Sequence, residues 1–568
     1  MEPVISFKNF SFKYKAQKQP TLSNINLNIY PGEKILICGP SGSGKSTLGN
    51  CINGLIPYSY PGTMEGSLTV DGVDTSHSSI FELSNHVGTV LQDPDGQFVG
   101  LTVAEDIAFA LENDAVPQQE MKERVAAVAE LVGVKSHLAN APQEISGGQK
   151  QRVSLAGVMV ANVKVLLFDE PLANLDPKTG KTAIELIDRI RDETDTTVII
   201  IEHRLEDVLW RHMDRIILVD NGGIVCDMTP DELLCTDILS EHGIREPLYI
   251  TALKYAGVKL TPDMHPCHIN DVILSDEDKA VVRSWFNSIT ADSVPVSDVE
   301  ALRTDNIRFS YHGSKQEIIR GFSVSVNEGE MLSLLGPNAA GKSSLAKLIC
   351  GFEKVSEGSI YYRGEDITAD TIRERARHIG YVMQNPNQMI SQTMIFDEVA
   401  LGIRNNGLSE DEIRERVYDT LKVCGLYEFR NWPVGALSFG QKKRVTIASV
   451  LVMGSDIIIL DEPTAGQDFR NYTEIMDFLQ SLNSRGVTII MITHDMHLML
   501  EYTSRAIVMV HGKKIADAPS ASVLCDPELV EKASLKETSL FTLAGLCGIS
   551  DSVKFTNCFI SHDKRVRE

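Results

Sequence analysis

One glycine-rich motif occurs twice in this chain of 568 residues. The first copy covers residues 39–46 as GPSGSGKS, and the second covers residues 336–343 as GPNAAGKS. The first copy follows an apolar strand pattern and precedes a helical one. In that context such a loop binds phosphate through backbone N–H groups, a helix N-terminus and a lysine. The chain is therefore expected to contain two phosphate-binding domains built of alternating strands and helices.

Further short motifs repeat at nearly the same distance. The motif lysines Lys45 and Lys342 lie 297 positions apart, and His203 and His494 lie 291 apart. Three more pairs share an offset of 292: Gln92 and Gln384, Ser146 and Ser438, Asp169 and Asp461. A whole domain is thus duplicated, and we expect one copy over residues 1–235 and the other over 302–525.

The remaining residues form a linker over 236–301 and a C-terminal tail over 526–568. Residues 247–258 of the linker resemble residues 538–549 of the tail, again at an offset of 291. We therefore expect each copy to carry a helical C-terminal appendage.

Composition excludes several classes of protein. The formal net charge of −23 argues against non-specific nucleic-acid binding, which depends on Lys and Arg contacts to phosphate. The ten cysteines include no C-x-x-C pair, which disfavours zinc and iron–sulfur sites and favours a reducing compartment. No run of 18 apolar residues occurs, so the chain is not expected to cross a membrane, although it could dock onto a protein that does.

Each copy contains an apolar run that ends in two acids, VLLFDE at residues 165–170 and IIILDE at residues 457–462. Two carboxylates at the end of a buried strand are costly without a cation. The first acid, Asp169 or Asp461, suits Mg²⁺, and the second, Glu170 or Glu462, can polarise an attacking water.

A second glycine motif precedes a long helical pattern in each copy, ISGGQ at residues 145–149 and LSFGQ at residues 437–441. A Ser-x-Gly sequence at a helix N-terminus is a candidate anion-binding site. Each copy is thus expected to hold two separate groups able to bind phosphate.

Together the phosphate loop, the Ser-x-Gly-Gln signature, the acidic pair and the later histidine resemble the ATP-binding cassette of ABC transporters. The resemblance covers nearly the whole chain except parts of the linker and about the last twenty residues. It implies an α/β fold with two P-loop ATPase domains, each with a mixed sheet core, an antiparallel β subdomain and a helical signature subdomain. It also implies hydrolysis of ATP with Mg²⁺.

The resemblance assigns roles to individual residues of both copies. The loops that hold ATP are Gly39, Pro40, Ser41, Gly42, Ser43, Gly44, Lys45, Ser46 and Thr47, and Gly336, Pro337, Asn338, Ala339, Ala340, Gly341, Lys342, Ser343 and Ser344. The Mg²⁺ ligands are Ser46, Gln92 and Asp169 in one site and Ser343, Gln384 and Asp461 in the other. The catalytic residues are Glu170, His203 and Gln92, and Glu462, His494 and Gln384.

In this family two cassettes pair head to tail, so each signature completes the other cassette's site. The first site would gain Ser438, Gly440 and Gln441, and the second Ser146, Gly148 and Gln149. Tyr14 and Tyr311 could stack on adenine or, as strand aromatics, belong to the core. Asp176 and Asp468 resemble the acids of the family's D-loop. Pairing within one chain and pairing between chains both stay open.

Two positions depart from the family pattern. Ala339 stands where a glycine is usual, which requires a backbone conformation open to a Cβ. Phe439 replaces the first glycine of the signature. Neither change removes a catalytic group, so both sites are expected to hydrolyse ATP.

The sequence around Gln92 narrows the subgroup. QDPDGQ at residues 92–97 resembles the ATPase subunits of energy-coupling factor importers, as do residues 102–113 and 201–208. Residues 384–388, QNPNQ, match less fully because a residue between Asn387 and Gln388 is missing from the pattern. The resemblance implies import of a vitamin, a thiamine precursor or a metal ion. It also implies a transmembrane coupling subunit, a substrate-binding membrane subunit and a location on the cytoplasmic face of the cell membrane.

Two alternatives remain at this point. Soluble ribosome-associated translation factors also carry tandem cassettes, but with a basic helical linker, whereas in residues 236–302 acidic residues outnumber basic ones. Tandem ATPases of sugar importers are the other alternative, and they usually have one degraded catalytic site. No nucleic-acid partner is expected.

Overall fold

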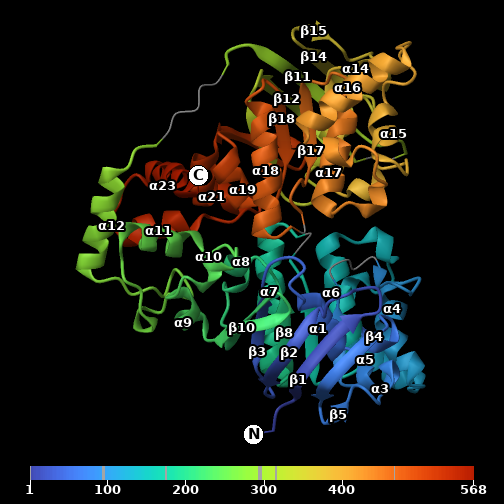
Figure 1. Cartoon of the computed structure of the whole chain (residues 1–568), viewed down its shortest axis with the longest axis vertical. Helices are drawn as coiled ribbons and strands as arrows, with labels where there is room; N and C mark the ends of the chain where they lie inside the picture. Colours follow the sequence, from blue (N-terminus) through green and yellow to red (C-terminus); the bar gives the residue numbers. More distant parts are fainter. Residues whose placement is uncertain are drawn as a thin grey trace. The chain divides into compact units, whose positions relative to one another are not determined.

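The computed structural model describes residues 2–91, 96–172, 175–291, 297–313, 316–465 and 467–567. The chain divides into two compact units, Met1–Ser284 with Asp468–Arg470, and Trp285–Gln467 with Asn471–Glu568. Each unit is described by itself, and Figure 1 colours them from blue to red along the chain. Among the described helices, none combines the length and the apolar character that a membrane crossing requires.

The first unit contains two sheets. A four-stranded antiparallel sheet has the order β2-β1-β4-β5, and a six-stranded sheet has the order β10-β9-β3-β8-β7-β6. In the larger sheet β10 runs antiparallel to β9, whereas the other neighbours are parallel. The strands are β1 (Ile5–Tyr14), β2 (Leu22–Ile29), β3 (Lys34–Cys38), β4 (Gly62–Val70), β5 (Val73–Asp74), β6 (Val87–Val90), β7 (Val165–Asp169), β8 (Thr197–Ile201), β9 (Arg215–Asp220) and β10 (Gly223–Met228).

The second unit repeats this arrangement strand for strand. Its sheets have the orders β12-β11-β14-β15 and β20-β19-β13-β18-β17-β16. The strands are β11 (Glu300–Phe309), β12 (Ile319–Asn327), β13 (Met331–Leu335), β14 (Glu357–Tyr362), β15 (Glu365–Asp366), β16 (Ile379–Val382), β17 (Ile457–Asp461), β18 (Thr488–Ile492), β19 (Arg505–Val510) and β20 (Lys513–Pro519). The predicted fold class, a mixed sheet with an antiparallel sheet in each of two cassettes, is confirmed.

Helices complete each cassette. Those of the first unit are α1 (Lys45–Ile52), α2 (Leu55–Tyr58), α3 (Ile80–Ser84), α4 (Val103–Asn113), α5 (Gln118–Leu131), α6 (Gly147–Met159), α7 (Pro177–Thr194) and α8 (Leu205–Val208). Those of the second are α13 (Lys342–Ile349), α14 (Ile372–Arg375), α15 (Ile395–Ala400), α16 (Glu410–Val423), α17 (Phe439–Leu451), α18 (Phe469–Asn483) and α19 (Met496–Tyr502). In the first cassette α4, α5 and α6 contact one another and form a helical subdomain. In the second cassette α15, α16 and α17 do the same.

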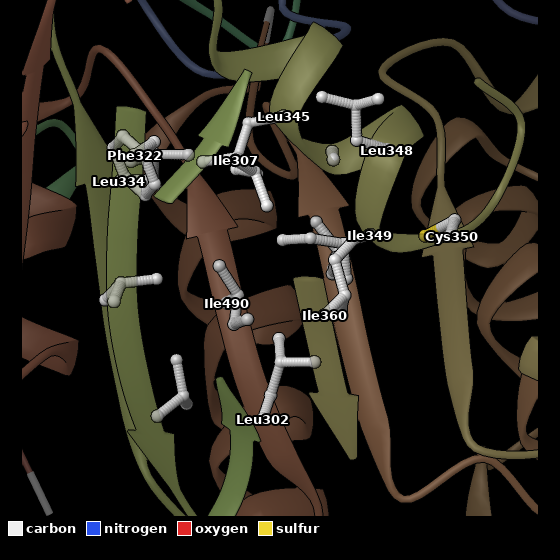
Figure 2. Close-up of a cluster of buried hydrophobic side chains, with 14 of the residues drawn as sticks. Leu302, Ile307, Phe322, Leu334, Leu345, Leu348, Ile349, Cys350, Ile360 and Ile490 are labelled. Carbon is white, nitrogen blue, oxygen red and sulfur yellow. The ribbon is translucent and has the colours of Figure 1, made fainter. Parts of the chain in front are cut away.

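The core of each cassette fixes the helix that follows the phosphate loop. In the second cassette, Leu345, Leu348 and Ile349 of α13 pack between Phe322 of the antiparallel sheet and Ile490 of the larger sheet (Figure 2). In the larger sheet of each cassette the central strands are apolar at nearly every position, because both faces of the sheet are covered. The loop at the start of α13 is therefore held by a rigid base.

The two appendages begin alike and then diverge. α11 (Leu248–Ala256) ends with Val258 N–H donating to Leu253 O at 3.0 Å, and α22 (Ser539–Leu546) ends with Ile549 N–H donating to Ala544 O at 2.8 Å. These helices are the two similar segments found in the sequence. The other appendage helices are α9 (Pro230–Leu234), α10 (Ile238–Glu241), α12 (Asp276–Ser288), α20 (Ser520–Leu524), α21 (Pro527–Lys532) and α23 (Ser552–Arg567).

The end of the linker packs on the C-terminal helix. Within the second unit, the rings of Trp285 and Phe286 lie 6.2 and 5.6 Å from that of Phe555 on α23. The Cys558 thiol lies 3.8 Å from Ile289 O. The linker therefore ends as part of the second cassette's own appendage.

Candidate functional site

The two phosphate loops have the same internal geometry. Lys45 Nζ donates to Gly39 O at 2.8 Å and to Pro40 O at 2.9 Å. Lys342 Nζ makes the equivalent bonds to Gly336 O and Pro337 O at the same two distances. Burial lowers the pKa of the Lys45 ammonium, and the nearby Glu170 opposes this. Each lysine is thus folded over its own loop at the start of α1 or α13.

The first glycine of each loop is required by a close backbone approach. Gly39 has φ 154°, and a Cβ there would lie 2.0 Å from Val219 O on β9. Gly336 has φ 143°, and its Cβ would lie 1.9 Å from Met509 O on β19. Ala339 differs, because it adopts the left-handed conformation at φ 61° despite its Cβ. A left-handed backbone conformation costs an L-residue about 1 kcal/mol, so alanine at this position destabilises the loop by about that much relative to glycine.

A tyrosine reaches the beginning of each loop helix. Tyr14 OH lies 3.1 Å from Thr47 Oγ1, and Tyr311 OH lies 3.0 Å from Ser344 Oγ. Each ring also packs edge-on against a phenylalanine of its own strand, at 4.8 Å between centroids. Tyr311 is exposed and Tyr14 is half-buried. Both tyrosines therefore lie beside the loop where an adenine ring could stack, and the stacking itself stays a prediction.

The acidic pairs lie at the ends of β7 and β17, next to the loop helices. Ser343 Oγ donates to Asp461 Oδ2 at 3.0 Å, and Tyr381 OH donates to the same oxygen at 2.8 Å. Burial raises the pKa of the Asp169 carboxyl, and a side-chain hydrogen bond from Ser46 opposes this rise. A hydroxyl and a carboxylate oxygen side by side are hard donors that suit Mg²⁺, so these residues fit the ion.

The second acid of each pair has an unusual backbone conformation. Glu170 has φ 50° and Glu462 has φ 45°, both in the left-handed region that non-glycine residues rarely adopt. Their N–H groups donate to Ile201 O and Ile492 O, each at 2.9 Å. Strain at a matching position in both copies indicates that the carboxylate direction has a function.

The histidines lie beside these glutamates. His203 Nδ1 is 3.8 Å from Glu170 Oε1, and His494 Nε2 is 3.6 Å from Glu462 Oε1. His203 Nδ1 also lies 3.2 Å from Glu202 Oε1, and burial lowers the pKa of this imidazole. The structure therefore brings the predicted lysine, acids and histidine of each cassette into one cluster.

The protonation of Glu170 gives a testable stability effect. Burial, and after it the charges of Glu202 and Asp169, raises the pKa of Glu170 to about 7. A carboxyl with a raised pKa in the folded state stabilises the fold when protonated, and this contribution is lost as the pH rises through about 7. We expect Glu170→Gln to raise the Tm of nucleotide-free, magnesium-free protein by about 2–4 °C or more at pH 8. The gain should be smaller at pH 6; a gain independent of pH would contradict this assignment.

The signature residues lie at helix starts, as expected. Ser146 Oγ accepts the Gln149 N–H at 3.4 Å, and Gln149 Oε1 accepts the Ser146 N–H at 2.8 Å. Ser438 and Gln441 make the same reciprocal pair at the start of α17. Phe439 is the first residue of α17 and is exposed, so it leaves this cap intact.

Gln92 lies outside the described residues, and so do the next three positions. Beyond them, Gln97 Oε1 accepts the Leu91 N–H at 3.0 Å. In the second copy the Met383 N–H donates to Met389 Sδ at 3.1 Å. Leu91 and Met383, like Gln97 and Met389, are 292 positions apart. The two segments therefore have equal length, and no residue is missing between Asn387 and Gln388. The second copy instead has Gln388 at the position of Gly96 and Met389 at the position of Gln97.

Three residues near the sites were not predicted from the sequence. Tyr381 contacts Asp461, whereas its counterpart Thr89 is bonded to Asn53. Glu202 is fully buried and accepts the backbone N–H groups of His203 and Arg204. Lys443 is fully buried on α17. The signal that could have revealed them is the mismatch between the copies, because Thr89, Thr493 and Gln151 stand at the matching positions.

Comparison with known proteins agrees with this geometry. A family model described as ABC transporter matches residues 22–173 and 319–465, and one described as ATP-binding cassette cobalt transporter matches residues 236–309. An ABC transporter ATP-binding protein of Clostridium perfringens is 56% identical over 564 residues, covering 99% of both chains. One of Enterococcus faecalis is 56% identical over 566 residues, covering 100% of this chain and 99% of its own.

A solved structure, that of cbiO1 from Clostridium perfringens, is described as part of the ABC transporter complex cbiONQ. It is 34% identical and covers 41% of this chain and 94% of its own, with a TM-score of 0.38. The two matched cassette regions and the full-length relatives lead to one conclusion. This chain belongs to the ATP-binding proteins of ABC transporters and carries two ATP-hydrolysing cassettes in one polypeptide.

Proposed function

We propose that the protein is the ATPase subunit of an energy-coupling factor type importer, bound to the cytoplasmic face of the cell membrane. Its cargo would be a small nutrient such as a metal ion, a vitamin or a thiamine precursor. The observation that carries the proposal is the match of residues 236–309 to the cobalt transporter family, a range that precedes the second ABC transporter match and consists mostly of the linker. The partners would be a transmembrane coupling subunit and a substrate-binding membrane subunit.

The chemistry at each site follows from the residues in place. Lys45 and the N-terminus of α1 bind the β- and γ-phosphates, and Glu170 accepts a proton from the attacking water. His203, which lies beside Glu170, would contact the γ-phosphate. Ser46 and Asp169 would hold Mg²⁺, which supplies charge neutralisation on the phosphates when bound. Lys342, Glu462, His494, Ser343 and Asp461 have the same roles in the second site.

The signatures would complete these sites crosswise. We propose that Ser438, Gly440 and Gln441 act on the ATP held by Lys45, and that Ser146, Gly148 and Gln149 act on the ATP held by Lys342. The capped helix starts support this role, since the free N–H groups of a helix N-terminus favour an anion. Binding of ATP would then close the pair of cassettes, and hydrolysis would reopen it.

A rigid apolar loop on the first cassette offers a docking surface for a membrane partner. Val99 is 60% exposed and Leu101 is 83% exposed, although both are apolar. The buried Asp106 accepts the N–H groups of Val99 and Gly100 at 2.9 and 3.1 Å and so fixes the loop. In the second cassette Glu398 fixes a loop of the same form, but with the polar Ser391 and Thr393 at the matching positions. The two cassettes thus present different surfaces to their partners.

We expect Leu101→Ser to weaken the association with the membrane partner without unfolding the protein, because the side chain is exposed. The measurement is the amount of integral membrane protein that copurifies with the variant from native membranes. Ile515→Ser, at another exposed apolar position, is the matched control and should copurify like the unchanged protein. Equal recovery with Leu101→Ser and the control would show that this loop is not the docking surface.

Purification of the protein from its native membranes tests the proposed function as a whole. The proposal predicts that integral membrane proteins copurify and that their presence raises ATP turnover. Recovery with ribosomes in ATP, and without a membrane partner, would favour the translation-factor alternative and contradict the proposal. The acidic linker already disfavours that alternative.

A further inference from the structure

The second cassette buries a lysine near its two acids, Asp461 and Glu462. Lys443, on α17, has a relative exposure of 0%. Its Nζ donates to Met383 O at 2.7 Å and to Gln384 O at 2.8 Å. These carbonyls belong to the two peptide groups on either side of the Gln384 Cα, and Gln384 is the residue predicted to contact Mg²⁺ and the attacking water. The lysine therefore joins the signature helix to the segment that carries Gln384.

A buried ammonium is costly, so its position calls for an explanation. Burial lowers the pKa of Lys443 to about 8, and the charges of Asp461 and Glu462 oppose this by favouring the charged form. The ammonium thus lies in the field of the two catalytic acids while it bonds to the backbone around Gln384. A structural role alone would be served by an apolar side chain at lower cost.

Further contacts hold the same segment. Met389 Sδ accepts the Met383 N–H, and Lys442 Nζ lies 3.3 Å from Asn387 Oδ1. Tyr381, two residues before Met383, donates to Asp461. These contacts connect the strand end, the Gln384 segment and the acid pair. Among the described residues of this set, Lys443 is the only charged group that bonds to the backbone carbonyls on both sides of the Gln384 Cα.

The first cassette is built differently at the matching position. Gln151 stands there, and its side-chain amide donates to Pro171 O, directly after Glu170. The first cassette's counterpart of Tyr381, Thr89, bonds to Asn53 instead of to an acid. The two sites thus have the same predicted catalytic residues but different side chains supporting them.

We propose that Lys443 is a positioning residue of the second ATP site only, which holds the Gln384 segment in register with Asp461 and Glu462. It acts through the carbonyls of Met383 and Gln384, to which its Nζ is bonded. The proposal rests on the ATPase activity of the family and is independent of the transported substrate. According to this proposal, ATP turnover at the second site depends on the link that Lys443 makes between α17 and the Gln384 segment, whereas turnover at the first site does not.

Two backgrounds isolate the sites, and the full-length protein is used throughout. In Glu170→Gln only the second site hydrolyses ATP, and in Glu462→Gln only the first does. Lys443→Met keeps the length of the side chain and removes its charge. It should lower kcat about 10- to 100-fold in the first background, since small misplacement of a catalytic group has effects of this size. The KM for ATP should stay near that of the parent, and the second background should keep its kcat.

A second readout does not depend on turnover. In nucleotide-free, magnesium-free protein, Lys443→Met should speed hydrogen exchange over residues 383–390 and leave α17 protected. Lys422→Met, an exposed lysine of α16, is the control for loss of a positive charge. If Lys443→Met fails to fold, Lys443→Gln decides, because glutamine occupies the matching position 151. Equal loss in both backgrounds, a raised KM with unchanged kcat, or unchanged exchange over residues 383–390 would overturn the proposal.

Discussion

Replacing Glu170 and Glu462 together by glutamine is expected to lower ATP turnover by about 10²- to 10⁴-fold, the usual contribution of a general base. Both carboxylates lie at the end of a central strand, with left-handed backbone and a histidine within 3.8 Å. Glutamine keeps the shape of the side chain but cannot accept the proton of the attacking water. ATP binding should therefore persist. The measurement is steady-state phosphate release, compared with equilibrium binding of a fluorescent ATP analogue.

The single variants are the controls for this result. Glu170→Gln and Glu462→Gln should each keep part of the turnover, because both cassettes have a complete set of lysine, acids and histidine. If Glu170→Gln alone abolished all turnover while Glu462→Gln changed nothing, the second site would be regulatory. Two hydrolytic sites would then be the wrong interpretation.

Replacing Lys45 or Lys342 by alanine is expected to remove tight ATP binding at one site each. Each ammonium is already held over its loop by two carbonyls, so little ordering is needed before it meets phosphate. A hydrogen bond to a charged group is worth about 1.5–3 kcal/mol, which corresponds to about 10- to 100-fold in Kd. Titration with a fluorescent ATP analogue should show one tight site for each single variant and none for the double variant.

Lys347→Ala is the matched control for this prediction. Lys347 lies on the same helix α13 but is exposed and outside the loop. It should bind ATP like the unchanged protein. Loss of both tight sites in a single lysine variant would instead indicate that the sites bind ATP only as a unit.

The duplicated motifs were enough to predict the fold, because each motif belongs to a fixed place in an α/β sheet. The run IIILDE predicts a buried strand that ends in acids, and β17 ends at Asp461. The Ser-x-Gly-Gln sequence predicts a capped helix start, and α6 and α17 begin there. The similar segments at residues 247–258 and 538–549 predicted the two matching appendage helices α11 and α22.

The differences between the sites were not predictable in the same way, because they depend on side chains that meet only in the folded chain. Lys443 is sixty positions from Met383 in the sequence, and nothing local marks it as buried. In the sequence Tyr381 looks like an ordinary strand residue, yet its hydroxyl donates to Asp461 at the end of β17. Backbone strain at Glu170 and Glu462 likewise has no sequence signal, since a left-handed φ at a non-glycine residue is imposed by the surrounding fold.

The central claim is that each signature acts on the ATP bound by the other cassette. Combining Ser438→Arg with Glu170→Gln or with Glu462→Gln tests it most directly. An arginine at the start of α17 should block the site that Ser438 completes. If that site holds Lys45 and Glu170, adding Glu170→Gln to Ser438→Arg should cause no further loss of turnover, while adding Glu462→Gln should abolish what is left. The reverse pattern, in which Glu462→Gln adds nothing and Glu170→Gln abolishes the rest, would show that each cassette uses its own signature and would contradict the account.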